Sequence, residues 1–469
     1  MKDSELIHSD PPLDWHALPD GSALLPPPSD EPELTTLPLT RAIFRLAGPA
    51  VASMLFVMVF NIIDIWWVGK LGADALAGVS AASFILWALE SMATLVGTGV
   101  TAMVARLYGA RRREQAGRVM GTGIVFAAAL ASGLGAAGWF LQRKTFAAMG
   151  LAGGILPPAL DYMTLILYGL PFIFIFFAVD AAFRGLGDTR TPLMIIASTL
   201  TLNILLDPVF IFGLGPVPAL GAGGAALATV LTHALGAVWG TLLLMRRTPL
   251  RWGADPGLAW RITRIGAPIA FSGTMFSISY MLLTRVITRF GPEPLAALGL
   301  GHRIEGLAYF TAVGFSVAAA ALVGQNLGAK KARRAERAAW LTFGYTSALL
   351  AVVCLCFYLG AESIIAFFIR DERVIGEGAH YLRIIALFEV FLGAEVVFEG
   401  AFSGAGNSLP PMLISVPLTW ARIPLALLLA GPFDLGSAGI WWAIATTTGI
   451  KGVLMALWFA RGRWKATRI

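Results

Sequence analysis

The sequence predicts an all-α polytopic membrane protein, with twelve transmembrane helices in two six-helix lobes related by a pseudo-two-fold axis along the membrane normal. Three observations predict this fold. Apolar residues form 57% of the 469 positions and charged residues only 13%, whereas a soluble chain has about 25% charged residues. Long apolar segments follow one another from Arg41 onward, and the second half of the sequence repeats the first.

The stretch 1–40 differs from the rest of the chain, because it is acidic, rich in proline and without hydrophobic periodicity. It lacks the basic start and apolar run of a signal peptide, so we expect a disordered cytoplasmic tail over 1–40. The remaining chain is expected to form an N-lobe over 41–250 and a C-lobe over 251–469.

Twelve apolar segments follow the tail, each near or above the roughly 20 residues that cross a bilayer core. Backbone polar groups cannot stay unpaired in hydrocarbon, so segments of this length are expected to be helices. The predicted segments are 43–68, 73–104, 119–141, 155–182, 192–214, 219–245, 263–288, 294–323, 338–361, 375–402, 409–431 and 435–460.

Basic residues predict the orientation of these helices. Twenty-one lysines and arginines lie around the loops after the second, fourth, sixth and eighth segments and in the C-terminal tail, against six in the opposite loops. The positive-inside rule therefore places both termini in the cytoplasm, in a multi-pass protein of the plasma (inner) membrane. The formal charge of +7 follows from these loops and does not indicate nucleic-acid binding.

The internal repeat becomes visible when the sequence is shifted so that Pro49 falls on Pro268, an offset that needs no gap over about 140 positions. The residues that coincide are mostly ones that punctuate helices. The further matches include Gly72 with Gly291, Gly109 with Gly328, Tyr162 with Tyr381, Phe183 with Phe402 and Pro192 with Pro411. Because each repeat holds six helices, both start on the same membrane face, an arrangement typical of alternating-access transporters.

Polar residues inside the predicted segments of the N-lobe are candidates for a cation site, because intramembrane ionisable groups are costly and usually functional. Asn203 and Asp207 are four residues apart and share one helix face. Carboxylate, amide and hydroxyl oxygens suit a hard cation, and two neighbouring carboxylates can also hold a proton. The alternative is that each acid only caps a helix or marks a membrane boundary. The candidates are Asp64, Asn203, Asp207, Thr229 and Asp180, with Tyr162 beside them.

The repeat restricts this site to one lobe. The same offset places Leu283 opposite Asp64, Arg422 opposite Asn203 and Ala426 opposite Asp207. Pro49 lies fifteen residues before Asp64 and frees a carbonyl within the first helix, which makes it a hinge candidate. Because Pro268 repeats this proline without an acid beyond it, a purely architectural role is the alternative.

Acids in the C-lobe are candidates for lining a substrate cavity, together with Tyr162. Glu399 lies at the position equivalent to Asp180, and Glu395 lies four residues earlier. The alternative is a set of ion pairs with Arg303, Arg383 or Arg422. The C-lobe candidates are Glu389, Glu395 and Glu399, while Glu90, His302, Arg303 and Glu305 receive no role from the sequence.

The chain from Arg41 onward resembles the multidrug and toxic compound extrusion (MATE) family. The motifs that carry this resemblance are GPAVASMLFVMVFNIIDIWWVGKLGADALAGVS, FRGLGDTRTP and VGQNLGAKKARRAERA. It looks more similar to the DinF-like prokaryotic subgroup, whose cation site implies Asp64, Asn203, Asp207 and Thr229, although that subgroup commonly has an amide where this chain has Asp180. NorM-like members have acids at the positions of Phe276 and Leu392, which are absent here.

We therefore expect a secondary antiporter that exports amphipathic, including cationic, organic compounds in exchange for H+ or Na+. Neither a cofactor nor a bound metal beyond the coupling ion is expected, and the partners are a small-molecule substrate and the lipid bilayer, with the protein as a monomer and without nucleic acid. The first alternative is a lipid or glycolipid flippase of a related paired-bundle fold. A major-facilitator transporter is disfavoured by the loop YGARRREQAGR, and an enzyme by the lack of catalytic motifs.

Overall fold

The computed structural model describes residues 34–467, so the stretch 1–33 of the predicted tail lies outside the described residues. The described part of the chain is almost entirely helical, which confirms the predicted fold class. Its long helices are α1 (Leu39–Gly69), α2 (Ala73–Gly109), α3 (Arg113–Ala148), α4 (Leu156–Leu186), α5 (Arg190–Phe212), α6 (Ala222–Arg247), α7 (Pro256–Ile287), α8 (Pro292–Gly328), α9 (Ala332–Phe368), α10 (Glu372–Ala386), α11 (Glu389–Gly404), α12 (Leu409–Ala430) and α13 (Gly436–Ala460).

Eleven of the described helices are long and apolar enough to span a membrane, and the chain is a multi-pass membrane protein. The tenth expected span, over 375–402, is two successive helices, because the chain turns at Leu387–Phe388 between α10 and α11. No proline or glycine marks this turn. The equivalent stretch of the first half stays within one helix, α4, although it contains Pro171.

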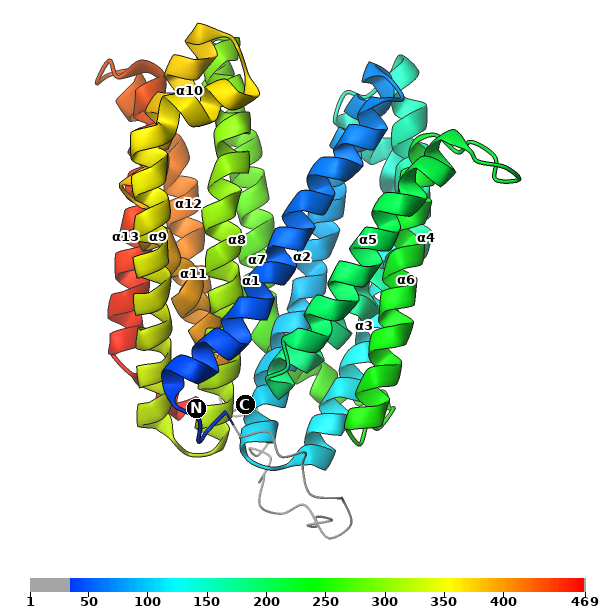
Figure 1. The fold of residues 1–469 in the computed structure, drawn as a ribbon, viewed down its shortest axis with the longest axis vertical. Helices are drawn as coiled ribbons and strands as arrows, with labels where there is room; N and C mark the ends of the chain where they lie inside the picture. The colour runs from blue at the N-terminus through cyan, green and yellow to red at the C-terminus, as the bar shows by residue number, and fades with distance from the viewer. Residues whose placement is uncertain (1–33, 468–469) are drawn as a thin grey trace, which may run out of the picture. The chain divides into compact units, whose positions relative to one another are not determined.

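Figure 1 shows α1–α6 and α7–α13 as two groups of helices, which we call the N-lobe and the C-lobe. Backbone geometry repeats between them at the offset that the sequence predicts. Gly72 and Gly291 precede α2 and α8 with φ of 109° and 103°, and Arg111 and Lys330 both adopt a φ of 61°. A left-handed backbone is uncommon for arginine and lysine, so its presence at equivalent turns shows that the two halves are built alike.

The lobes contact each other through α1 and α2 of the N-lobe and α7 and α8 of the C-lobe. Glycines allow the backbones to approach closely there. A Cβ atom on Gly99 or Gly266 would overlap the backbone of α7 or α2, and one on Gly314 would overlap Val51 of α1. Small residues at helix crossings are the usual means of close packing in membranes, and these glycines fix where the two lobes meet.

Aspartates cap several of the helices, because their side-chain oxygens accept the otherwise unpaired N–H groups of the first turn. Asp255 accepts from Gly257 and Leu258 at the start of α7, and Asp371 accepts from Arg373 and Val374 at the start of α10. Asp188 does the same before α5 and also pairs with Arg247, the last residue of α6, at 2.8 Å.

The segment 34–38 differs from the predicted tail, which extends to residue 40. Leu34 and Leu37 are buried against residues of α8, α9, α11 and α13. Lys331 donates to the carbonyl oxygen of Thr35 at 3.0 Å, and Arg334 donates to those of Leu34 and Leu37. Apolar burial and these hydrogen bonds hold the segment on the helices, although its composition resembles that of the preceding residues.

Candidate functional site

Asn203 and Asp207 lie side by side in the interior of the N-lobe, as their spacing on one face of α5 predicts. Both side chains are fully buried. The Asn203 amide nitrogen donates to Thr232 at 3.2 Å and to Thr229 at 3.4 Å, which connects α5 to α6. Thr232 in turn donates to carbonyl oxygens of its own helix, so its hydroxyl oxygen is aimed at the amide.

Asp64 on α1 belongs to the same neighbourhood, because its charge acts on Asp207. Tyr162 on α4 is almost completely buried and lies within the electrostatic reach of Asp64, Asp207 and Glu90. The structure therefore brings together the four helices α1, α4, α5 and α6 around the predicted residues. It also adds Glu90 of α2 and Thr232 of α6, to which the sequence analysis gave no role.

Oxygen atoms without a hydrogen-bond partner distinguish this group of residues. Within residues 34–467, one carboxylate oxygen of Asp64, both of Asp207 and the amide oxygen of Asn203 are buried and unpartnered. Leaving buried acceptors unsatisfied costs about 1–3 kcal/mol each. A cation or a proton would satisfy acceptors of this kind. We call Asp64, Asn203, Asp207, Thr229 and Thr232 the N-lobe site.

The composition of the N-lobe site restricts the ion that it suits. Among the described residues, no group of three or more His, Cys, Asp and Glu side chains is placed to hold a metal ion. Two carboxylates with an amide and hydroxyls form a hard, all-oxygen donor set, which fits Na+ or a proton better than a transition metal.

Asp180, a candidate of the sequence analysis, lines a small pocket with Ile196 of α5 and Gly236 of α6. It forms an ion pair with Arg184, one turn later on α4, at 2.8 Å. Asp180 is eighteen residues beyond Tyr162 on the same helix, which corresponds to about 27 Å at the rise of an α-helix. The two side chains share a helix face, but distance along the helix separates them.

Glu395 in the C-lobe forms a buried ion pair with Lys451 of α13, at 2.7 Å and with side chains only 9% and 3% exposed. Ser415 also donates to Glu395, at 3.1 Å. The sequence analysis gave ion pairs with arginines as the alternative to a cavity role for the C-lobe acids, and it did not consider Lys451. A lysine inside a predicted membrane segment was the signal that could have identified it.

Two of the three arginines considered as partners for the C-lobe acids, Arg383 and Arg422, have other partners, and the third, Arg303, is exposed. Arg383 pairs with Glu362 at 2.9 Å on the exterior, and Arg422 is bound by hydroxyl groups. Glu305 accepts a hydrogen bond of 2.7 Å from Tyr381 and lies 3.4 Å from His302. Glu395 therefore forms an ion pair, as the alternative interpretation expected, but its partner is a lysine rather than an arginine.

The other two cavity candidates of the C-lobe lie on α11. Glu389 is its first residue, directly after the turn from α10; it is 2% exposed and lies within the electrostatic reach of Glu305. An acid at a helix N-terminus is stabilised by the helix dipole. Glu399 lies within the electrostatic reach of Glu395 and Lys451.

The hinge candidate Pro49 lies within α1, which continues as one helix from Leu39 to Gly69. Ser53 donates to the carbonyl oxygen of Pro49 at 3.0 Å. Proline removes one hydrogen bond of the helix, so α1 is locally weakened between the turn that contacts the C-lobe and the turn that carries Asp64.

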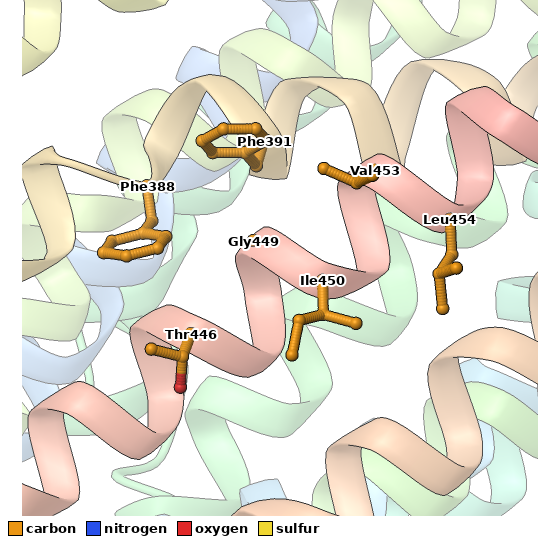
Figure 2. A pocket seen from close by; sticks show the side chains of 7 residues that line it. All are labelled: Phe388, Phe391, Thr446, Gly449, Ile450, Val453 and Leu454. Carbon is orange, nitrogen blue, oxygen red and sulfur yellow. The ribbon is translucent and has the colours of Figure 1, made fainter.

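A pocket of about 440 Å³ lies between α11 and α13, and none of its lining residues is a predicted site residue. Figure 2 shows its lining, in which Phe388 and Phe391 face residues 446–454 of α13. Ile450, Val453 and Leu454 are exposed. The pocket is a shallow apolar groove on the exterior of the C-lobe, and its composition suits lipid chains rather than a polar substrate.

Comparison with known proteins agrees with this architecture. The family model MatE matches residues 49–209 and again 268–428. The two matched stretches are related by the same offset that the sequence repeat shows. This chain belongs to the MatE family. It is a membrane transporter rather than an enzyme.

Curated relatives cover nearly the whole chain. It is 29% identical over 440 residues to "Probable multidrug resistance protein NorM" of Thermotoga maritima, covering 91% of this chain and 93% of that protein. It is 25% identical to "FAD transporter" of Shewanella oneidensis, covering 90% and 95%. The solved structure described as "Crystal structure of MATE in complex with MaL6" has a TM-score of 0.86 at 24% identity, covering 92% of this chain and 98% of that one. That structure shows the same fold in a MatE-type protein.

Proposed function

We propose that this protein is a secondary antiporter that exports amphipathic organic compounds, including cationic ones, from the cytoplasm in exchange for H+ or Na+. The observation that carries this proposal is the N-lobe site, where carboxylate and amide oxygens are buried without partners among residues 34–467. Asp64 and Asp207 exchange the coupling ion, and Asn203 and Thr229 complete its shell. The multidrug resistance protein of Thermotoga maritima, similar over most of its length, supports an efflux role.

Alternating access supplies the coupling in this proposal. Occupation of the N-lobe site neutralises Asp64 and Asp207, which removes their mutual repulsion and allows α1 to pack differently against α5. Pro49 weakens α1 between the site and its contact with the C-lobe, so a change at Asp64 is transmitted as a bend. Cation and drug then favour opposite arrangements of the lobes, which is the condition for exchange.

Within the MatE family we place the chain closer to the DinF-like subgroup than to NorM-like members. The support is the acid-rich site in the N-lobe, together with Phe276 and Leu392 at the positions where NorM-like members have acids. We further propose that the protein is monomeric and lies in the inner membrane with both termini on the cytoplasmic side, as the distribution of basic loop residues favours.

The experiment is efflux of ethidium by proteoliposomes in which a proton gradient and a sodium gradient are imposed separately. Wild-type protein should extrude ethidium with at least one gradient, and the gradient that drives efflux identifies the ion. Asp64→Asn and Asp207→Asn should each abolish gradient-driven efflux, whereas Asp74→Asn, at an exposed acid in the first turn of α2, should retain it. Wild-type rates in both site variants would contradict the proposed coupling site.

A further inference from the structure

Arg422 on α12 is buried in the C-lobe, with only 2% of the residue exposed. Its guanidinium donates to three hydroxyl groups: Thr447 at 2.8 Å, Thr448 at 2.8 Å and Tyr280 at 2.9 Å. Within residues 34–467, no carboxylate lies within ion-pair distance of this guanidinium. Because hydroxyl groups are neutral, they satisfy the hydrogen bonds of the arginine but do not neutralise its positive charge.

The nearby acids are occupied elsewhere. Glu395 is paired with Lys451, and Glu305, whose charge reaches Tyr280, is bound by Tyr381. An uncompensated charge in the interior of a membrane protein is expensive. Its retention in a site lined by hydroxyls indicates that an anionic group completes it at some stage of transport.

The hydroxyls around Arg422 are themselves arranged as donors. Thr447 donates to carbonyl oxygens of α13, but Thr448 and Tyr280 only accept from the arginine, and no acceptor for their protons is present among residues 34–467. The remaining guanidinium N–H groups and these two hydroxyl protons are donors without an acceptor among residues 34–467. Such a set matches the oxygens of a carboxylate or phosphate.

The repeat places this group of donors opposite the N-lobe site. Arg422 is equivalent to Asn203. Gly221 before α6 and Gly436 before α13 share a φ of 55°, so Thr447 of α13 is equivalent to Thr232 of α6. The hydrogen bond to this threonine recurs in each lobe. Asp207 is replaced by Ala426. The positions that hold an amide and a carboxylate in the N-lobe therefore hold an arginine and no acid in the C-lobe.

We propose that Arg422, with Thr448 and Tyr280, binds a carboxylate or phosphate group on an aromatic compound that the protein transports. This deepens the proposed function, on which it rests, by naming a class of substrate. Tyr280 is half-buried, and its ring packs against the exposed Phe276 at 4.5 Å between ring centroids and against His302 at 4.9 Å. These rings would receive the aromatic part of the compound while the anionic group reaches Arg422.

The test compares two fluorescent probes that differ only in the acidic group, N-dansyl-phenylalanine and its neutral amide. Binding to the full-length protein in phosphatidylcholine nanodiscs is measured by dansyl fluorescence. Wild-type protein should bind the carboxylate about ten- to hundredfold more tightly than the amide, the range for a hydrogen bond to a charged group. Arg422→Gln should remove this preference, and Tyr280→Phe should reduce it severalfold while keeping the ring.

The matched control is Arg303→Gln, which removes an exposed arginine of the neighbouring α8 and should keep the full preference. If Arg422→Gln does not fold, Arg422→Lys and Tyr280→Phe still decide the question, because both should weaken binding of the carboxylate more than of the amide. Equal binding of the two probes by wild-type protein, or an unchanged preference in Tyr280→Phe and Arg422→Lys, would overturn the proposal.

Two further measurements separate the possible failures. If wild-type protein extrudes ethidium but binds both probes equally, the proposed antiport stands and the anion site does not. In a second measurement, phosphatidylglycerol is added to the nanodisc. If it displaces the carboxylate probe both from wild-type protein and from Arg303→Gln, which has the same net charge as Arg422→Gln, the anion bound by Arg422 is a lipid phosphate. The assignment to a transported compound is then overturned.

Discussion

Gly109 on α2 and Gly328 on α8 pack reciprocally against each other's helices. A Cβ atom on Gly109 would overlap the backbone carbonyl of Gln325, and one on Gly328 would overlap that of Arg106. Gln325 and Arg106 are themselves equivalent positions of the repeat. They bridge the lobes at this crossing, because Arg106 donates to Ala405 and Gln325 donates to Gly185, both at 3.1 Å. The two lobes are thus locked at one end by a symmetrical contact.

Substituting either glycine with alanine is expected to destabilise this arrangement. The added methyl group meets backbone rather than a movable side chain, and overpacking of this kind costs about 1–3 kcal/mol. Gly109→Ala and Gly328→Ala should therefore lower the thermal unfolding midpoint in detergent. Gly344→Ala on α9, where a Cβ would meet no atom within 4 Å, is the control and should leave the midpoint unchanged or raised.

Thr232→Val tests a residue of the N-lobe site that only the structure identifies. Valine has nearly the same shape but cannot accept the hydrogen bond from Asn203, so the amide loses one of its two threonine partners. We expect the coupling ion to be needed at severalfold higher concentration for half-maximal efflux, with the protein still folded. Thr342→Val on α9, also fully buried but bonded only to its own helix, should show wild-type ion dependence.

Lys451→Met should be strongly destabilising, because it leaves the buried carboxylate of Glu395 without its cation. Breaking one side of a buried pair costs about 3–5 kcal/mol. The double variant Lys451→Met/Glu395→Gln should recover most of this loss in a thermal unfolding experiment. Lys465→Met breaks the Lys465–Glu336 pair, which has the same 2.7 Å separation but about a third of each side chain exposed, and should cost about 1 kcal/mol or less. Equal losses for the two single variants would contradict the assigned role of burial.

Asp180→Asn should leave ion coupling intact, because Asp180 already has a counter-charge in Arg184 at 2.8 Å. Gradient-driven ethidium efflux by this variant should stay within about twofold of wild type, a span of under about 0.5 kcal/mol. Asp207→Asn, measured in parallel, provides the comparison. Loss of coupling in Asp180→Asn equal to that in Asp207→Asn would return Asp180 to the ion site.

The sequence was sufficient to predict the helices, the repeat and the grouping of Asn203, Asp207 and Thr229. These features follow from hydropathy, fixed spacing and the polarity of single residues inside apolar segments. Asp64 could be added because an acid in such a segment requires a partner. Only the structure adds Glu90 to this group. Whether Glu90 faces α4 depends on how α2 packs against α4, which the sequence does not show.

Other features depend on tertiary contacts that no local pattern records. The turn between α10 and α11 has neither proline nor glycine, and it places Glu389 at a helix start near Glu305. The partner of Glu395 is Lys451, 56 residues away on α13. A positive charge alone does not indicate which of the basic residues in the C-lobe pairs with Glu395.

The ion pair between Lys451 and Glu395 also has an electrical consequence. A tethered cation and its carboxylate move together and carry no net charge through the membrane field, whereas one unpaired charge is worth about 2.3 kcal/mol per 100 mV. Asp64 and Asp207 have no such tethered counter-charge among residues 34–467. Voltage sensitivity of the transport cycle would therefore arise where the two aspartates are filled and emptied, while the Lys451–Glu395 pair stays electrically silent.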